Sequence, residues 1–199
     1  MKHFLKRTSV LVIGVVIFVL GVITPMKADP LPIGVWTEFS FTAAGTPATG
    51  CFPNDPAGNF CIPSSGTPST FLGAPPWTFT SPVASTLTVT DAFEAGDRFQ
   101  LFDFGASIGL SSLPFGSADC GDDPVPCLGT AGISDGLFGL GPGAHSITLT
   151  PTLSLGGGSA FLRVDAVPEP STWILVGEGI AIMCLVRGKP QRTDKRRSS

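Results

Sequence analysis

The stretch STLTVTDAFEAGDRFQLFDF (residues 85–104) decides the expected fold, because polar and apolar side chains alternate along both of its halves. In the first half, three threonines share one face of an extended chain, while Leu87 and Val89 share the other. Alternation with a period of two is typical of a β-strand that is buried on one side. The central EAGD (residues 94–97) is a turn candidate, and it predicts that the two halves form a hairpin.

The alternation of the second half continues to residue 110, and three other segments show a similar pattern, namely residues 33–41, 145–155 and 159–167. In the first of these, the odd-numbered residues from Ile33 to Phe41 share one face. The chain contains 25 glycines and 19 prolines, which favours short strands joined by turns, and its central part offers no convincing amphipathic helix. We therefore expect an all-β ectodomain, built as an antiparallel β-sandwich or a jelly-roll-like fold.

Charge divides the chain into three segments: 1–28, 29–166 and 167–199. The middle segment contains twelve acidic residues but only two basic ones, Arg98 and Arg163, for a net charge of −10. Such a surface repels phosphate backbones, so nucleic-acid binding is excluded from the expected functions.

Residues 1–28 have the features of a secretory signal peptide that forms an N-terminal helix. Three basic residues precede the uncharged apolar run from Val10 to Ile23, whose 14 residues suit a signal sequence better than a full membrane span. Cleavage is expected after Ala28, and an uncleaved membrane anchor is the alternative.

Export places the middle segment in an oxidising compartment, where cysteines form disulfides. Its four cysteines allow three pairings. We favour Cys51–Cys61 and Cys120–Cys127, because each pair closes a short loop rich in Pro, Gly or Asp. A metal site is disfavoured, since the spacing is not CxxC and His145 is the only histidine of this segment.

Two long loops are expected to carry these cysteine pairs. Residues 43–76 are dense in Pro, Gly, Ser and Thr and predict a long loop, stapled by one disulfide or partly disordered. Residues 111–132 form the second loop.

The sequence contains no recognisable catalytic motif, so we expect a non-enzymatic protein without a cofactor. Neither GxSxG nor HExxH occurs, and His145 could act as a general base only if a Ser and an acid lay beside it. The simpler interpretation is a surface or strand-edge histidine.

Acidic residues give the main alternatives to a non-enzymatic function. A glycosidase would need two carboxyl groups that face each other across a cleft, and a calcium site would need oxygen ligands converging from a loop. The candidate acids form two groups: Asp91, Glu94 and Asp97 in the first, and Asp119, Asp122 and Asp123, the better calcium candidates, in the second. Trp36 and Trp77 could form a sugar-stacking platform, although aromatic residues in alternating strands are more often core.

The C-terminal segment VPEPSTWILVGEGIAIMCLVRGKPQRTDKRRSS (residues 167–199) consists of a Pro-Glu-Pro motif, an apolar run and a basic tail. The 14-residue run from Trp173 to Val186 would form a helix of about 21 Å, shorter than the bilayer core of about 30 Å. Glu178 lies near its centre, where an acid costs on the order of 3 kcal/mol. We therefore predict that this segment forms a short transmembrane helix that holds the protein at the membrane only temporarily. The alternative is a permanent single-pass membrane anchor.

This segment resembles the PEP-CTERM sorting signal, which the membrane-embedded enzyme exosortase recognises in Gram-negative bacteria that make exopolysaccharide. The resemblance implies that Pro168, Glu169 and Pro170 are the recognition motif and that the residues after it are removed. The stretches DAFEAGDRFQLFDFGASIGLSS, CGDDPVPCLG, GAHSITLT and FLRVDAVPEPSTW are similar to an ectodomain that recurs among such proteins.

These features together predict a protein that is exported across the inner membrane of a Gram-negative bacterium and then sorted to the cell surface or the extracellular matrix. Its expected partners are the sorting enzyme, the membrane through the C-terminal helix, and extracellular polysaccharide within a biofilm. A secreted carbohydrate-active enzyme and a calcium- or sugar-binding adhesion module are the alternatives.

Overall fold

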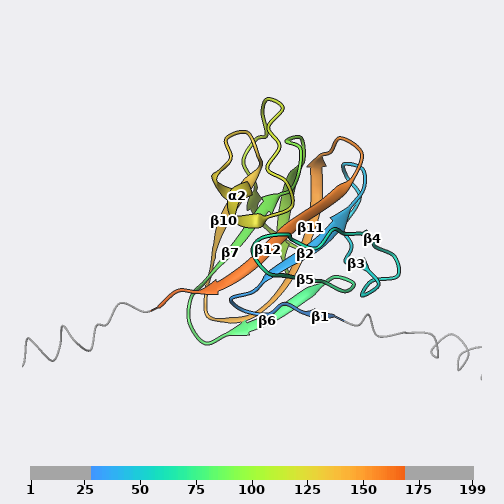
Figure 1. Cartoon of the computed structure of the whole chain (residues 1–199). Helices are drawn as coiled ribbons and strands as arrows, with labels where there is room; N and C mark the ends of the chain where they lie inside the picture. Colours follow the sequence, from blue (N-terminus) through green and yellow to red (C-terminus); the bar gives the residue numbers. More distant parts are fainter. Residues whose placement is uncertain (1–27, 169–199) are drawn as a thin grey trace, which may run out of the picture.

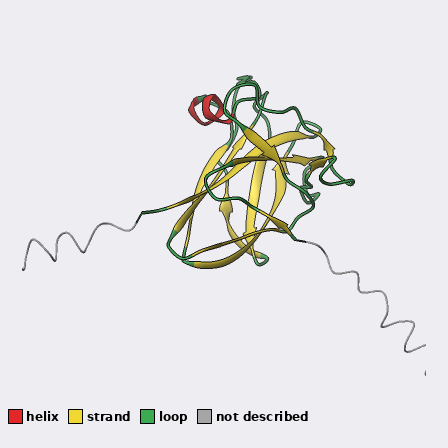
Figure 2. Cartoon of the chain, turned by 60° about the horizontal axis from the view of Figure 1, so that its bottom comes forward, coloured by secondary structure: helices red, strands yellow, loops and turns green. Residues whose placement is uncertain are grey.

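The computed structural model describes residues 28–168 as one sandwich of two five-stranded β-sheets (Figures 1 and 2). The predicted signal segment and nearly all of the sorting segment lie outside the described residues. The strands are β1 (Asp29–Pro30), β2 (Trp36–Phe41), β3 (Cys51–Phe52), β4 (Asn59–Phe60), β5 (Ser69–Phe71), β6 (Trp77–Ser81), β7 (Ser85–Asp91), β8 (Arg98–Asp103), β9 (Ala106–Leu110), β10 (Asp135–Leu140), β11 (Gly143–Leu153) and β12 (Gly158–Ala166). The predicted all-β sandwich is confirmed.

Two sheets face each other, and we name each after its central strand. The β11 sheet has the order β1-β6-β11-β8-β9, and the β12 sheet has the order β10-β7-β12-β2-β5. Most neighbours are antiparallel, whereas β1 pairs with β6 and β2 with β5 in parallel. A separate parallel pair is formed by β3 and β4.

The alternation along β7 has the predicted effect on burial. Leu87 and Val89 are completely buried between the sheets, where they join the main apolar core. Thr88 and Thr90 face the other way and are buried as well. The outer face of the β12 sheet is therefore also covered in this region.

The core between the sheets is built around a group of aromatic side chains. The ring of Phe99 in β8 lies 5.5 Å from that of Phe39 and 5.0 Å from that of Phe41, both in edge-to-face geometry. Phe39 also contacts Trp77 of β6, with ring centroids 5.5 Å apart. Because these rings come from β2, β6 and β8, the cluster joins the two sheets.

The predicted hairpin at residues 94–97 is wrong. The strand before this turn, β7, pairs with β10 and β12, whereas the strand after it, β8, pairs with β11 and β9. The segment therefore carries the chain from one sheet to the other. A turn signal indicates a change of direction, but it does not indicate which strands will become hydrogen-bonded neighbours.

The first expected strand is shorter than its alternation suggested. It begins at Trp36 rather than at Ile33, which is 42% exposed and forms only an isolated bridge to Val164. Gly34, with φ of 81°, has a left-handed backbone conformation that interrupts the extended chain at this point.

The two long loops carry the predicted disulfides and some secondary structure of their own. Cys51 is bonded to Cys61, and Cys120 to Cys127, so both favoured pairings are confirmed. Residues 43–76 include β3, β4 and β5. Residues 111–132 include a helix of six residues, α2 (Pro124–Gly129), although no helix was expected in this part of the chain.

The second disulfide loop covers part of the outer face of the β12 sheet. Leu128 of α2 and Phe93 pack on a second apolar cluster formed by Trp36, Ala92 and Phe161. In Figure 1, α2 lies at the top of the sandwich, whereas β1 and the end of β12 lie at the bottom. The second disulfide loop and the two ends of the domain thus occupy opposite ends, whereas β3 and β4 of the first disulfide loop lie at the side of the sandwich.

Replacing Phe99 by alanine is expected to lower the free energy of unfolding by about 3–5 kcal/mol, because it removes a buried ring between two other rings. Chemical denaturation monitored by circular dichroism measures the loss. Phe104→Ala is the control, since Phe104 is 70% exposed and should change stability by about 0.5 kcal/mol at most. Equal losses in the two variants would contradict the placement of Phe99 in the core.

Candidate functional site

The structure brings the two groups of candidate acids together at one end of the sandwich. Residues 93–95 run antiparallel to residues 118–121, with backbone hydrogen bonds of 2.8 to 2.9 Å. Glu94 and Asp119 face each other in this short ladder. No local sequence pattern indicates this contact, because the two segments belong to different loops.

Acidic side chains from both groups line one shallow cavity of about 390 Å³. Glu94, Asp97 and Asp119 are among the residues that line it, as are Leu155 and Ser159. This cavity is the feature that best matches the predicted acidic site.

Asp91 and Asp97 nevertheless use their carboxylates to hold the backbone. Asp91 is completely buried and accepts hydrogen bonds from the amides of Ala92, at 3.0 Å, and Asp97, at 3.2 Å. The Asp97 carboxylate accepts a bond of 3.0 Å from the amide of Leu155. Both side chains therefore stabilise the crossing between the sheets rather than face a substrate.

Burial also changes the acidity of these groups. The pKa of Asp91 is raised to about 8, first by loss of solvation and then by the neighbouring charge of Asp97, while hydrogen bonds from the backbone of residues 92, 96 and 97 oppose the rise. The pKa of Asp97 is raised as well, mainly by burial. A raised pKa in a cleft can mark a catalytic acid, but here Asp91 has no surface through which a substrate could reach it.

The three calcium candidates have separate structural roles. Asp119 accepts a hydrogen bond from the amide of Gly121, and Asp122 from the hydroxyl of Ser65 at 2.6 Å. Asp123 caps the N-terminus of α2 through the amide of Val125 and also accepts one from the amide of Thr67. Asp122 and Asp123 thus join the two disulfide loops over the β12 sheet.

His145 is held in a hydrogen-bonded pair that leaves it no free ring nitrogen. Its Nδ1 lies 2.8 Å from a carboxylate oxygen of Asp103, and its Nε2 lies 3.0 Å from the backbone oxygen of Gly141. The ring is 8% exposed and stacks on Phe79. A triad histidine would need Nε2 to face a nucleophilic hydroxyl, and a backbone oxygen occupies that position.

The two tryptophans offer no stacking face for a sugar. Trp77 is completely buried and donates a hydrogen bond of 2.8 Å from its indole to the backbone oxygen of Gly73. Trp36 is 4% exposed, contacts Phe161 edge to face, and is covered by the guanidinium of Arg163. Their interpretation as core residues is confirmed.

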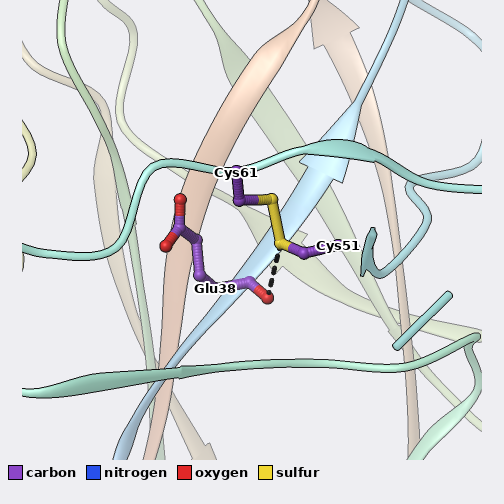
Figure 3. Close-up of side chains that lie close together, drawn as sticks. All are labelled: Glu38, Cys51 and Cys61. Atoms are coloured by element: carbon purple, nitrogen blue, oxygen red, sulfur yellow. Dashed lines mark hydrogen bonds between the residues drawn. A yellow bond between two sulfur atoms is a disulfide. The ribbon is translucent and has the colours of Figure 1, made fainter. Parts of the chain in front are cut away.

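Sequence reasoning missed a buried carboxylate beside the first disulfide. Glu38 of β2 is completely buried, and neither of its carboxylate oxygens has a hydrogen-bond partner. One of these oxygens and the sulfurs of Cys51 and Cys61 lie within 4.8 Å of one another (Figure 3). The one available signal was the position of Glu38 in an alternating strand with Trp36 and Ser40 on the same face.

The group formed by Glu38, Cys51 and Cys61 is the only cluster of three potential metal ligands among residues 28–168. Metal ions bind thiolates, and the two sulfurs are joined in a disulfide. The oxidised group is therefore not a metal site.

The sorting motif lies at the end of the described chain. Pro168 is exposed two residues after the end of β12, while Glu169 and Pro170 are outside the described residues. Residues 28–168 contain no helix that is long and apolar enough to span a bilayer.

Comparison with known proteins adds no assignment, because no family model, curated protein or solved structure matches this chain.

Changing Asp91 to asparagine is expected to weaken the pH dependence of stability. The pKa of this acid rises from 3.8 in the unfolded chain to about 8 in the fold. The native state therefore binds the proton more tightly, so its stabilising contribution is complete below about pH 4 and is lost as the pH rises to about 8. Melting temperatures from pH 4 to 9 measure this slope, which should be smaller in the variant.

Asp119→Asn serves as the matched control at the same end of the sandwich, because Asp119 is exposed. Its pH profile should follow that of the unmodified chain. If the melting temperature of D91N changed with pH as steeply as that of D119N, Asp91 would not be a buried acid.

Proposed function

We propose that this chain is a non-enzymatic surface or extracellular-matrix protein that a Gram-negative bacterium exports and sorts through a PEP-CTERM signal. The observation that carries the proposal is the position of the domain boundaries. The first strand begins at Asp29, immediately after the expected cleavage site, and the last strand ends at Ala166, two residues before the Pro-Glu-Pro motif. The sandwich therefore fills the space between the two targeting segments.

The two disulfides support export. Disulfides are stable in oxidising compartments and rare in the bacterial cytosol. Each of these bridges stabilises a loop that lies on the sandwich surface, and the loops are further joined by Ser65–Asp122 and Thr67–Asp123 hydrogen bonds. Such cross-linking suits a domain that must persist outside the cell.

The roles of the acidic residues support a non-enzymatic function. Asp91 and Asp97 bind backbone amides, Asp123 caps a helix, and His145 is held between Asp103 and a backbone oxygen. These four side chains, which were among the candidates for hydrolytic chemistry or its support, are thus engaged in hydrogen bonds that maintain the fold.

The arrangement of the ends supports attachment at one end of the sandwich. β1 and the end of β12 lie at the end opposite α2 (Figure 1), so a membrane segment that follows β12 would leave the second disulfide loop pointing away from the membrane. Association with extracellular polysaccharide belongs to this proposal. A surface with a net charge of −10 over residues 29–166 favours neutral or cationic polymers over anionic ones.

A calcium- or sugar-binding adhesion module is the second candidate, because Glu94, Asp97 and Asp119 share the cavity of about 390 Å³. Calorimetry with calcium distinguishes the two proposals. Binding heat that is lost in a Glu94→Gln variant would favour the adhesion module, whereas the absence of heat would favour a purely structural protein.

Mass spectrometry of the protein from cells with and without the sorting enzyme tests the main proposal. With the enzyme, the mature chain should begin at Asp29 and lack the tail beyond the Pro-Glu-Pro motif, because the resemblance implies that these residues are removed. Without the enzyme, the tail should persist on membrane-associated protein.

Glu169→Gln provides the matched variant, since it changes the motif without changing the apolar run or the basic tail. It should keep the intact C-terminus even in the presence of the enzyme. An intact Ser199 on stably embedded wild-type protein from normal cells would refute the sorting proposal.

A further inference from the structure

The carboxylate of Glu38 and the Cys51–Cys61 disulfide form an isolated group on the outer face of the β12 sheet (Figure 3). The side chain points away from the main core, because Phe39 and Phe41 of the same strand point into it. The loop that contains Cys61 and Ile62 covers this face, and Asp122 reaches it from the second disulfide loop. The group is thus closed off by both loops.

A completely buried carboxylate without a hydrogen-bond partner is costly to keep in a folded protein. Other buried acids of this domain are satisfied, since Asp91 and Asp97 accept backbone hydrogen bonds. The Glu38 carboxylate accepts no such bond, and one of its oxygens lies within 4.8 Å of the two sulfurs, while the Cys51 sulfur lies 3.2 Å from the backbone oxygen of Glu38. Its position therefore points to chemistry at the cysteine pair.

We propose that Glu38 is the proton acceptor for closure of the Cys51–Cys61 disulfide and the proton donor for its opening. Cys51 needs such a group, because it is completely buried and water cannot reach its sulfur, whereas Cys61 is 9% exposed and accessible to a small reagent. A thiol reacts only as its thiolate, so a buried thiol requires an internal base.

The oxidant of the reaction is an external disulfide, written RSSR. The Cys61 thiolate attacks one of its sulfurs, which forms the mixed disulfide Cys61–S–S–R and releases RS⁻. The Cys51 thiol then transfers its proton to the Glu38 carboxylate, and the resulting thiolate attacks the Cys61 sulfur. The Cys51–Cys61 bond forms, the bond to R breaks, and the second RS⁻ leaves. Two electrons pass from the cysteine pair to RSSR, and the Glu38 proton passes to the leaving thiolate.

The acidity of Glu38 suits this exchange. The pKa of Glu38 is raised to about 7, mainly by burial, which outweighs the opposing effects of the nearby Ser159 side chain and Ile62 backbone; the charge of Asp122 makes the smallest contribution to the rise. A base with a pKa near that of the medium can both accept and return a proton. Asp122 is the charged neighbour that acts on this group, and it comes from the second disulfide loop.

The chain contains its own control, because Cys120 and Cys127 form a second disulfide, and no carboxylate of residues 28–168 clusters with both of its sulfurs in this way. The experiment uses the full chain in mild detergent, reduced under native conditions and then mixed with glutathione disulfide. Samples are quenched with acid and an alkylating reagent, and peptide mass spectrometry follows closure of each pair separately.

Glu38→Gln should slow closure of Cys51–Cys61 by about 100-fold or more, the lower end of the range for loss of a general base. Closure of Cys120–Cys127 should change by no more than about 2-fold. Between pH 5 and 8, the rate ratio of wild type to E38Q for the first pair should rise as Glu38 loses its proton.

Equal closure rates of Cys51–Cys61 in wild type and E38Q would overturn the proposal, and so would an equal slowing of both pairs, since that result indicates a general loss of structure. If E38Q does not fold, the proposal is tested on the wild-type chain alone. The rate of the first pair relative to the second must then rise through about pH 7, and a flat ratio refutes the role. Tight zinc binding by the reduced chain that requires Glu38, without an effect on closure, would assign a metal-binding role instead.

Discussion

The arrangement of the domain depends on how the chain crosses from one sheet to the other after Asp91. The Asp91 carboxylate lies between the sheets and accepts hydrogen bonds from the amides of Ala92 and Asp97, which are the first and last residues of the crossing. This buried acid closes the turn and fixes the direction in which β8 starts. The crossing also presents residues 93–95 to residues 118–121, so it determines where the second disulfide loop lies.

The two disulfide loops in turn bury a second acidic side chain, that of Glu38. Ser65 and Thr67 of the first loop bind Asp122 and Asp123 of the second, and together the loops close the outer face of the β12 sheet. Glu38 lies beneath them without a hydrogen-bond partner. Asp91 and Glu38 therefore owe their raised pKa values to the same cause, burial, but Asp91 is satisfied by backbone amides and Glu38 is not. That difference separates a structural acid from one that is available for proton transfer.

The sequence was sufficient for features that depend on local pattern. Alternation identified the inward-facing Leu87 and Val89, and loop composition favoured the correct cysteine pairs. It was insufficient where partners come from distant segments. The hairpin at residues 94–97 failed because β7 finds its neighbours in β10 and β12, and the burial of Glu38 depends on loops that follow it in the chain. Helix α2 did have a local signal, an N-capping Asp123 followed by Pro124, but six residues are too few to show a periodic pattern.

A domain whose acids and histidine maintain its own turns fits an exported structural protein better than a hydrolase. Carbon-13 NMR of the Asp91 carboxyl group across pH tests the underlying constraint most directly. The carboxyl carbon should titrate with a midpoint near pH 8, and the amide signals of Ala92 and Asp97 should shift with the same midpoint. A midpoint near 4, with both amides unaffected, would contradict the claim that a buried Asp91 holds the crossing between the sheets.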